Sequence, residues 1–340
     1  MKNVSAFAMY NLKIKKVIYF DFALSRIIFI GLLFICISSC TEEKLREYTA
    51  ELLYQARSET GNAALWHPDR KSVFWVDTEY NLLHEYIPSI DKCNSWKFTS
   101  TVGSVVPETA KTVILALSDR IIRFNTETDE KENIAFIDVE NGHLRCNDGK
   151  CSPNGKLWIG TTSYNYEKGA GSAYCVHPDG KVDQMFKGLT AANGLVWSKN
   201  HQFMFHNDVS NKVVKRYRYD IKTEDVIHNG VAINIPNGTG IPEGIIIDQQ
   251  DNLWIPQRGG FGVYCYNPYT GQLVAKVNVP TPNVTSCTFG GENLDTIFIT
   301  TSRKGLTKEE LEKYPLSGSI FTCQIAPIGT KPFYFGRQNF

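Results

Sequence analysis

The fold of this chain is decided by a short β-type run, KLWIGT at residues 156–161, which is one of six similar runs. The other five are SVFWVD (72–77), TVILAL (112–117), QFMFHND (202–208), NLWIPQ (252–257) and TIFITT (296–301). Their first residues lie 40 to 50 positions apart. A supersecondary unit that recurs at such a period indicates a repeat architecture.

Most of these runs are followed, after a turn, by a second β-rich run, such as SAYCVHPDGK at 172–181. Aromatic and β-branched residues closed by Asn-Pro or Pro-Asp-Gly turns are hairpin signals. Six units of about 45 to 50 residues predict an all-β protein, a six-bladed β-propeller. A β-sandwich is the alternative, but its strands would not repeat a two-hairpin unit six times. We expect an early strand within 51–57 to join the last blade, and a short helical insertion at 306–314.

Composition excludes several classes of protein. The 340 residues are 42% hydrophobic and carry a net charge of +1, which argues against a nucleic-acid binder. The sequence has no Gly-x-Ser-x-Gly, His-Glu-x-x-His or phosphate-loop pattern. We expect a monomer that does not bind nucleic acid.

The first forty residues read as a targeting segment. The apolar stretch IIFIGLLFICISS at 27–39 is too short for a membrane span and fits a signal-peptide core. The run Ile-Ser-Ser-Cys that ends at Cys40 resembles a lipobox, whose Cys is lipidated. We predict a signal peptide over 1–40, a propeller over 45–340, and a periplasmic or outer-membrane bacterial lipoprotein that touches the membrane only through its anchor. A plain secretory signal and a membrane anchor are the alternatives.

Five longer motifs carry a family resemblance. They are RCNDGKCSPNGKLWIGT (145–161), AANGLVWS (191–198), FHNDVSNKVVKRYRYD (205–220), IPEGIIIDQQDNLWI (241–255) and TSCTFGGENLDTIFITTS (285–302). Together they resemble the senescence-marker-protein/gluconolactonase/luciferin-regenerating family, from about residue 51 to about residue 324. That family has a six-bladed propeller, which agrees with the repeat count.

The resemblance implies a site at the mouth of the central channel that holds one divalent cation and opens a sugar lactone. Carried over by position, the metal ligands fall on Asn147, Asn193 and Asp208, and Asp208 is also the implied acid/base. A substrate-contacting arginine falls on Arg145. Oxygen ligands suit Ca²⁺ first, with Mg²⁺ or Zn²⁺ as alternatives. The cation would polarise the lactone carbonyl or activate water, and Asp208 would take the proton.

One position departs from the family pattern. The run GNAALW puts Asn62 where the family has its first ligand, a glutamate. Affinity for a hard dication depends on ligand charge. Either the metal binds more weakly, or Glu59 or Glu243 compensates, or the site is not a metal hydrolase. Arg258, after an inner strand, is a further candidate for binding an acidic substrate, although a solvated loop arginine would look the same.

Two functions therefore remain open at this point. The first is a metal-dependent lactonase that uses Asp208 as its base and retains Asn62 at the degenerate ligand position. The second is a propeller that binds a sugar acid or a partner without turnover. A hydrolase of another ester or phosphoester is a further possibility, since fold does not fix function.

Overall fold

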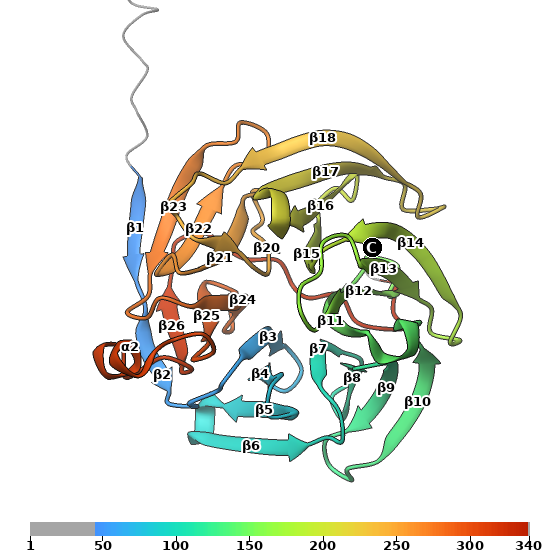
Figure 1. Ribbon diagram of the computed structural model, residues 1–340, viewed down its shortest axis with the longest axis horizontal. Helices are drawn as coiled ribbons and strands as arrows, with labels where there is room; N and C mark the ends of the chain where they lie inside the picture. Colours follow the sequence, from blue (N-terminus) through green and yellow to red (C-terminus); the bar gives the residue numbers. More distant parts are fainter. Residues whose placement is uncertain (1–44, 339–340) are drawn as a thin grey trace, which may run out of the picture. The chain divides into compact units, whose positions relative to one another are not determined.

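The computed structural model describes residues 45–338, and this part of the chain is almost entirely β. Its strands form six sheets that follow one another around a ring (Figure 1). Five sheets have four strands and one has six. In the first four sheets along the chain the inner strand comes first in sequence. The predicted six-bladed β-propeller is confirmed.

The blades are numbered here in chain order from the first inner strand. Blade 1 comprises β3 (Gly61–His67), β4 (Ser72–Asp77), β5 (Leu82–Ile87) and β6 (Lys92–Lys97). Blade 2 comprises β7 (Val102–Pro107), β8 (Thr112–Leu117), β9 (Arg120–Asn125) and β10 (Lys131–Phe136). Blade 3 comprises β11 (Leu144–Cys151), β12 (Leu157–Ser163), β13 (Gly171–Val176) and β14 (Val182–Leu189).

Blade 4 comprises β15 (Ala192–Trp197), β16 (Phe203–Asp208), β17 (Val213–Tyr219) and β18 (Val226–Asn234). Blade 5 comprises β19 (Ile241–Pro242), β20 (Ile246–Ile247), β21 (Leu253–Arg258), β22 (Gly262–Tyr266), β23 (Leu273–Asn278) and β1 (Arg46–Thr49). Blade 6 comprises β24 (Val284–Gly290), β25 (Thr296–Thr301), β26 (Ile320–Gln324) and β2 (Glu51–Tyr54). Short helices are η1 (Pro88–Ile90), η2 (Glu140–Gly142), η3 (Val209–Asn211) and α2 (Lys308–Lys313).

The six runs that predicted the fold are the second strands of the six blades, β4, β8, β12, β16, β21 and β25. A second strand is covered on both faces by the neighbouring blades, so every residue of β4 is buried. The outermost strand β6 is mostly exposed or half-buried. Because burial on both faces requires a continuous apolar run, the second strands are the part of each blade that the sequence reveals best.

The ring is closed by the start of the described chain. Strand β2 pairs antiparallel with β26 and is the outer strand of blade 6, as predicted. Strand β1, which the sequence did not predict, pairs parallel with β23 of blade 5. Two successive strands at the beginning of the ring thus fasten its last two blades.

Two further features complete the description of residues 45–338. The predicted helical insertion is α2, which begins with a capping box between Thr307 and Glu310. The described part contains no helix with the length and apolar character that a membrane span requires. The prediction for residues 1–40, including lipidation of Cys40, lies outside the described residues.

An ion pair in blade 1 gives a prediction about acid stability. The fully buried Glu85 accepts hydrogen bonds from Arg70 Nε at 2.7 Å and from Ser72 Oγ at 2.7 Å. Burial alone would raise the pKa of Glu85, but the bonds from Arg70 and Ser72 outweigh it and lower the pKa. The pair therefore stabilises the fold above the ordinary glutamate range, and this contribution is lost as pH falls through the lowered pKa.

We expect Glu85→Ala to lower the free energy of unfolding by about 3 kcal/mol at pH 7, because it breaks a buried pair. Urea unfolding at pH 7 and at pH 3 measures the effect, which should shrink at the lower pH. An exposed carboxylate, as in Glu127→Ala, is the control. Equal losses at both pH values would contradict the assignment.

Candidate active site

The inner strands of all six blades depart from regular pairing at one equivalent position. In β3, β7, β11, β15 and β24 the register with the second strand shifts there. In blade 5 the inner strand is interrupted there instead, between β19 and β20. Such a bulge bends the strand and re-aims its side chains, and bulges are common beside active sites.

The first residue of each irregularity belongs to what we call the polar ring. It follows an inner-strand residue whose partner is the last residue of the second strand or lies up to two residues before it, as Asn62 follows Gly61, the partner of Asp77. The six members are Asn62, Gly103, Asn147, Asn193, Glu243 and Thr285. Five carry polar side chains, and all five of these residues are at most 9% exposed. The ring contains one carboxylate, that of Glu243.

Backbone contacts join neighbouring members of the polar ring. Thr285 Oγ1 donates to the carbonyl oxygen of Gly61 at 2.5 Å, which links blade 6 to blade 1. A Cβ added at Gly103 would lie 2.6 Å from the carbonyl oxygen of Asn147, so blades 2 and 3 touch through backbone. Gly194, at φ +92°, would meet Ile245 Cγ2 at 2.5 Å. Glycine after Asn193 is thus what lets blade 4 approach the Glu243 segment.

Glu243 is the best-connected side chain of the polar ring. Its Oε2 accepts from Asn193 Nδ2, and its Oε1 accepts from Arg258 Nε at 2.7 Å. Its backbone carbonyl accepts from Asn207 Nδ2 at 2.5 Å. Two of the predicted site residues, Asn193 and Arg258, are therefore brought together, and the group that joins them is Glu243.

A second contact pair lies in blade 3. Arg145 Nη1 donates to Asn147 Oδ1 at 3.1 Å and to the Cys146 carbonyl at 3.2 Å. The Arg145 guanidinium carbon lies 5.9 Å from the ring centroid of Tyr164, an exposed residue of the loop after β12. Arg145 is 7% exposed, so the predicted substrate arginine is held in place rather than solvated.

Asn62 occupies the ring position where the family pattern has glutamate. Its Oδ1 accepts from the backbone N–H of Ala63 at 2.8 Å, and Ala63 has a positive φ of 49°. The side chain therefore supports the bulge that carries it. It brings no charge to the ring.

Asp208 lies outside the polar ring, on the second strand of blade 4, where it pairs with Ala192. Its Oδ2 accepts from Lys215 Nζ at 2.6 Å and from Asn211 Nδ2 at 3.0 Å, and it caps η3. Burial acts to raise the pKa of Asp208, but the bonds from Lys215 and Asn211 outweigh it, and the pKa is lowered. Ala192 directly precedes the predicted ligand Asn193, so backbone pairing brings Asp208 next to that position of the inner strand.

Reasoning from sequence missed two neighbouring buried residues of β16, of which Asn207 donates to the Glu243 carbonyl. Asn207 is fully buried and its Oδ1 has no hydrogen-bond partner. His206 is buried with both ring nitrogens unpartnered, and burial lowers its pKa to about 4. Glu243 itself was predicted only as a possible substitute for the lost glutamate. Spacing in the sequence could have found it. Asn62, Asn147, Asn193 and Glu243 each stand ten residues before the first residue of a second strand, at Ser72, Leu157, Phe203 and Leu253.

The side-chain atoms of the polar ring that could act as metal ligands are oxygen atoms. Asn193 Oδ1 is buried and accepts no hydrogen bond from the protein. Amide and carboxylate oxygens suit a hard cation. Residues 45–338 hold no group of three or more His, Cys, Asp or Glu side chains that could bind a metal ion. A cation here would therefore depend on amide oxygens and on Glu243.

The fold and the polar ring define a class of protein, the six-bladed propellers with a polar site at one end of their inner strands. A family model described as SMP-30/Gluconolactonase/LRE-like region matches residues 60–303. The chain belongs to this family.

Named relatives agree with the family assignment. The "Putative sugar lactone lactonase YvrE" of Bacillus subtilis is 30% identical over 286 residues, covering 84% of this chain and 98% of the relative. Regucalcin of Xenopus laevis is 28% identical, covering 80% and 92%. The crystal structure of a calcium-binding protein, regucalcin from Agrobacterium tumefaciens, has a TM-score of 0.81 at 22% identity, covering 86% of this chain and 99% of that one. The structural likeness supports the fold.

Proposed function

We propose that this protein hydrolyses a sugar lactone at the polar ring, with Glu243 as the general base. The observation that carries the proposal is the position of Glu243, the one carboxylate of the ring, in contact with Asn193 and Arg258. The family contains gluconolactonases, and a relative at 30% identity is named for lactone hydrolysis. The substrate class follows from these two lines of support together.

Each polar side chain has a part in this proposal. Glu243 takes the proton from the attacking water, while Asn193 and Arg258 hold its carboxylate in one orientation. The contact with Glu243 uses only Nε–H of Arg258, one of the five N–H donors of a guanidinium. The others are available to a carbonyl oxygen that gains charge as the ring opens. Arg145 binds hydroxyl or carboxylate oxygens of the sugar.

The proposal also includes a divalent cation bound at the polar ring. The unpartnered Asn193 Oδ1 and the amide oxygen of Asn147 fit a hard cation, with Glu243 as the charged ligand and Asn62 at the fourth position. A bound cation would polarise the lactone carbonyl. Because Arg258 already neutralises Glu243, we expect Ca²⁺ to bind more weakly than it would to an unpaired carboxylate.

The test is a pH-stat assay of the purified protein on a panel of aldono- and aldaro-lactones, with and without a chelator. We expect saturable ring opening of at least one sugar lactone, faster with Ca²⁺ present. Absence of turnover across the panel by folded protein would overturn the proposal.

Arg145 gives a prediction about substrate binding. We expect Arg145→Lys to raise KM about tenfold with a smaller change in kcat, since an ammonium lacks the planar fork of a guanidinium. Initial-rate kinetics over a range of lactone concentrations measures the effect. Arg120→Lys on β9, a half-buried arginine, is the control. A fall in kcat with KM unchanged would contradict a binding role.

A binding module is the second candidate, and the observation that favours it is Asn62. With a neutral amide in place of the glutamate and Arg258 paired to Glu243, the ring carries little net negative charge for a dication. Such a site would hold a sugar acid without turnover. Tight calorimetric binding of aldonates, together with no lactone turnover, would identify it.

We propose that the protein is exported from a bacterial cell and anchored to a membrane as a lipoprotein. Support comes from the apolar stretch at 27–39 and from Cys40 after it. Mass spectrometry of the protein purified from its native host should find a diacylglyceryl modification on Cys40 as the new N-terminal residue. An unmodified Cys40 inside a longer chain would refute this.

A further inference from the structure

A large cavity lies beyond the polar ring, along the second half of the inner strands. It has a volume of about 590 Å³ and is lined by residues that follow the ring members on the same strands. Ala64 and Leu65 follow Asn62, Lys150 follows Asn147, and Val196 follows Asn193. The cavity is therefore a separate space from the site proposed for lactone hydrolysis.

A segment near the chain end, residues 328–337, crosses the far opening, and we call it the C-terminal strap (Figure 1). On one side Thr330 Oγ1 donates to the carbonyl of Ile247 at 3.0 Å. On the other side Phe335 N–H donates to the carbonyl of Pro107 at 2.9 Å. The strap is thus fastened to blades on both sides, and its residues 330–334 form one wall of the cavity.

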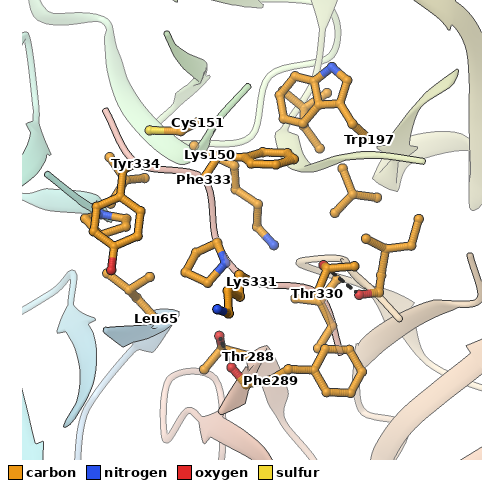
Figure 2. A pocket seen from close by; sticks show the side chains of 18 of the residues that line it. Leu65, Lys150, Cys151, Trp197, Thr288, Phe289, Thr330, Lys331, Phe333 and Tyr334 are labelled. Atoms are coloured by element: carbon orange, nitrogen blue, oxygen red, sulfur yellow. Dashed lines mark hydrogen bonds between the residues drawn. The ribbon is translucent and has the colours of Figure 1, made fainter. Parts of the chain in front are cut away.

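The walls of this cavity are largely apolar. Figure 2 shows Leu65, Trp197, Phe289 and Phe333 around the space. Trp197 Nε1 is buried and has no hydrogen-bond partner. Apolar walls combined with polar groups characterise sites for small organic ligands, and this volume lies within the range typical of them.

Two ammonium groups enter the cavity from different elements. Lys150 extends from β11 and donates to the carbonyl of Ile245, and Lys331 extends from the C-terminal strap (Figure 2). An ammonium has three donors, so Lys150 retains donors for a ligand. Lys199 and Arg337 also line the space, as do the carboxylates Asp69 and Asp148. Four cationic side chains and two carboxylates thus line the cavity, and this excess of positive charge favours an anionic ligand.

We infer that this cavity binds a small amphipathic carboxylate, with the alkyl body against the apolar walls and the carboxylate between Lys150 and Lys331. The inference stands apart from lactone hydrolysis, which would take place at the polar ring.

The experiment titrates octanoate into the purified protein by calorimetry and follows tryptophan fluorescence, since Trp197 lines the space. We expect saturable binding of one octanoate per chain. Lys331→Gln should weaken it about fivefold, the range for a partly exposed ion pair. Ala64→Phe, which puts a ring into the cavity, should abolish it. Lys92→Gln on β6 is the matched control and should bind as the wild type does.

Octanol tests whether the charge matters, and we expect it to bind at least fivefold more weakly than octanoate. Absence of saturable octanoate binding by folded wild-type protein would overturn the inference. So would equal affinities for octanol and octanoate, or wild-type affinity in both Lys331→Gln and Ala64→Phe.

Discussion

Replacement of Glu243 by glutamine is expected to lower kcat/KM for lactone hydrolysis about 1000-fold, the middle of the range for removing a general base. Glutamine keeps the size of the side chain and can still accept from Arg258 Nε. It cannot take a proton from water at neutral pH. The fold should be unaffected, because the backbone carbonyl of residue 243 still accepts from Asn207.

Glu243→Asp provides the matched comparison for this loss. Aspartate keeps the carboxylate but is shorter by one methylene, so we expect it to recover a substantial part of the activity. Initial rates in a pH-stat, with thermal unfolding as a check on folding, measure both variants. Equal inactivity of the two would point to a positioning defect rather than to loss of a base.

The second large effect concerns calcium. We expect the double substitution Asn62→Glu with Arg258→Gln to raise Ca²⁺ affinity about 100-fold, with each change contributing about tenfold through the charge of the ring. The first adds a carboxylate at a ring position, and the second releases Glu243 from its ion pair. Calorimetric titration with Ca²⁺ alone measures the affinity without reference to turnover.

The single variants separate the two contributions, and Glu243→Gln in the double-variant background is the control. If Arg258→Gln leaves Ca²⁺ affinity at the wild-type value, the ion pair with Glu243 does not compete with the cation. If Asn62→Glu alone has no effect, position 62 does not face the bound ion.

The architecture could be predicted from sequence because the second strands are buried on both faces. TVILAL at 112–117 is β8 with the same bounds, and SVFWVD at 72–77 is β4. Strand β1 was missed, because a four-residue strand that is largely exposed carries little apolar signal. Its place is set by pairing with β23, more than 200 residues away in sequence, which no local pattern reveals.

The candidate site could be predicted in part. Asn147 lies in the motif RCNDGKCSPNGKLWIGT and Asn193 in the motif AANGLVWS, so both could be predicted. The structure places both in the polar ring together with Asn62. The assignment of the acid/base role to Asp208 remains a prediction, but its geometry is that of a strand-end carboxylate that caps η3. Glu243 was harder to recognise, because the inner strand of blade 5 is broken into two residue pairs around it. Such short strands have no period that a sequence pattern can show.

The most direct test of the central claim compares the two carboxylates in one assay. Asp208→Asn and Glu243→Gln are measured side by side for kcat/KM on the lactone that wild-type protein opens fastest. The polar ring predicts that Asp208→Asn keeps most of the activity, since an amide can still accept from the Asn211 backbone that Asp208 caps, while Glu243→Gln loses about three orders of magnitude. The reverse order, an inactive Asp208→Asn and an active Glu243→Gln, would contradict the account.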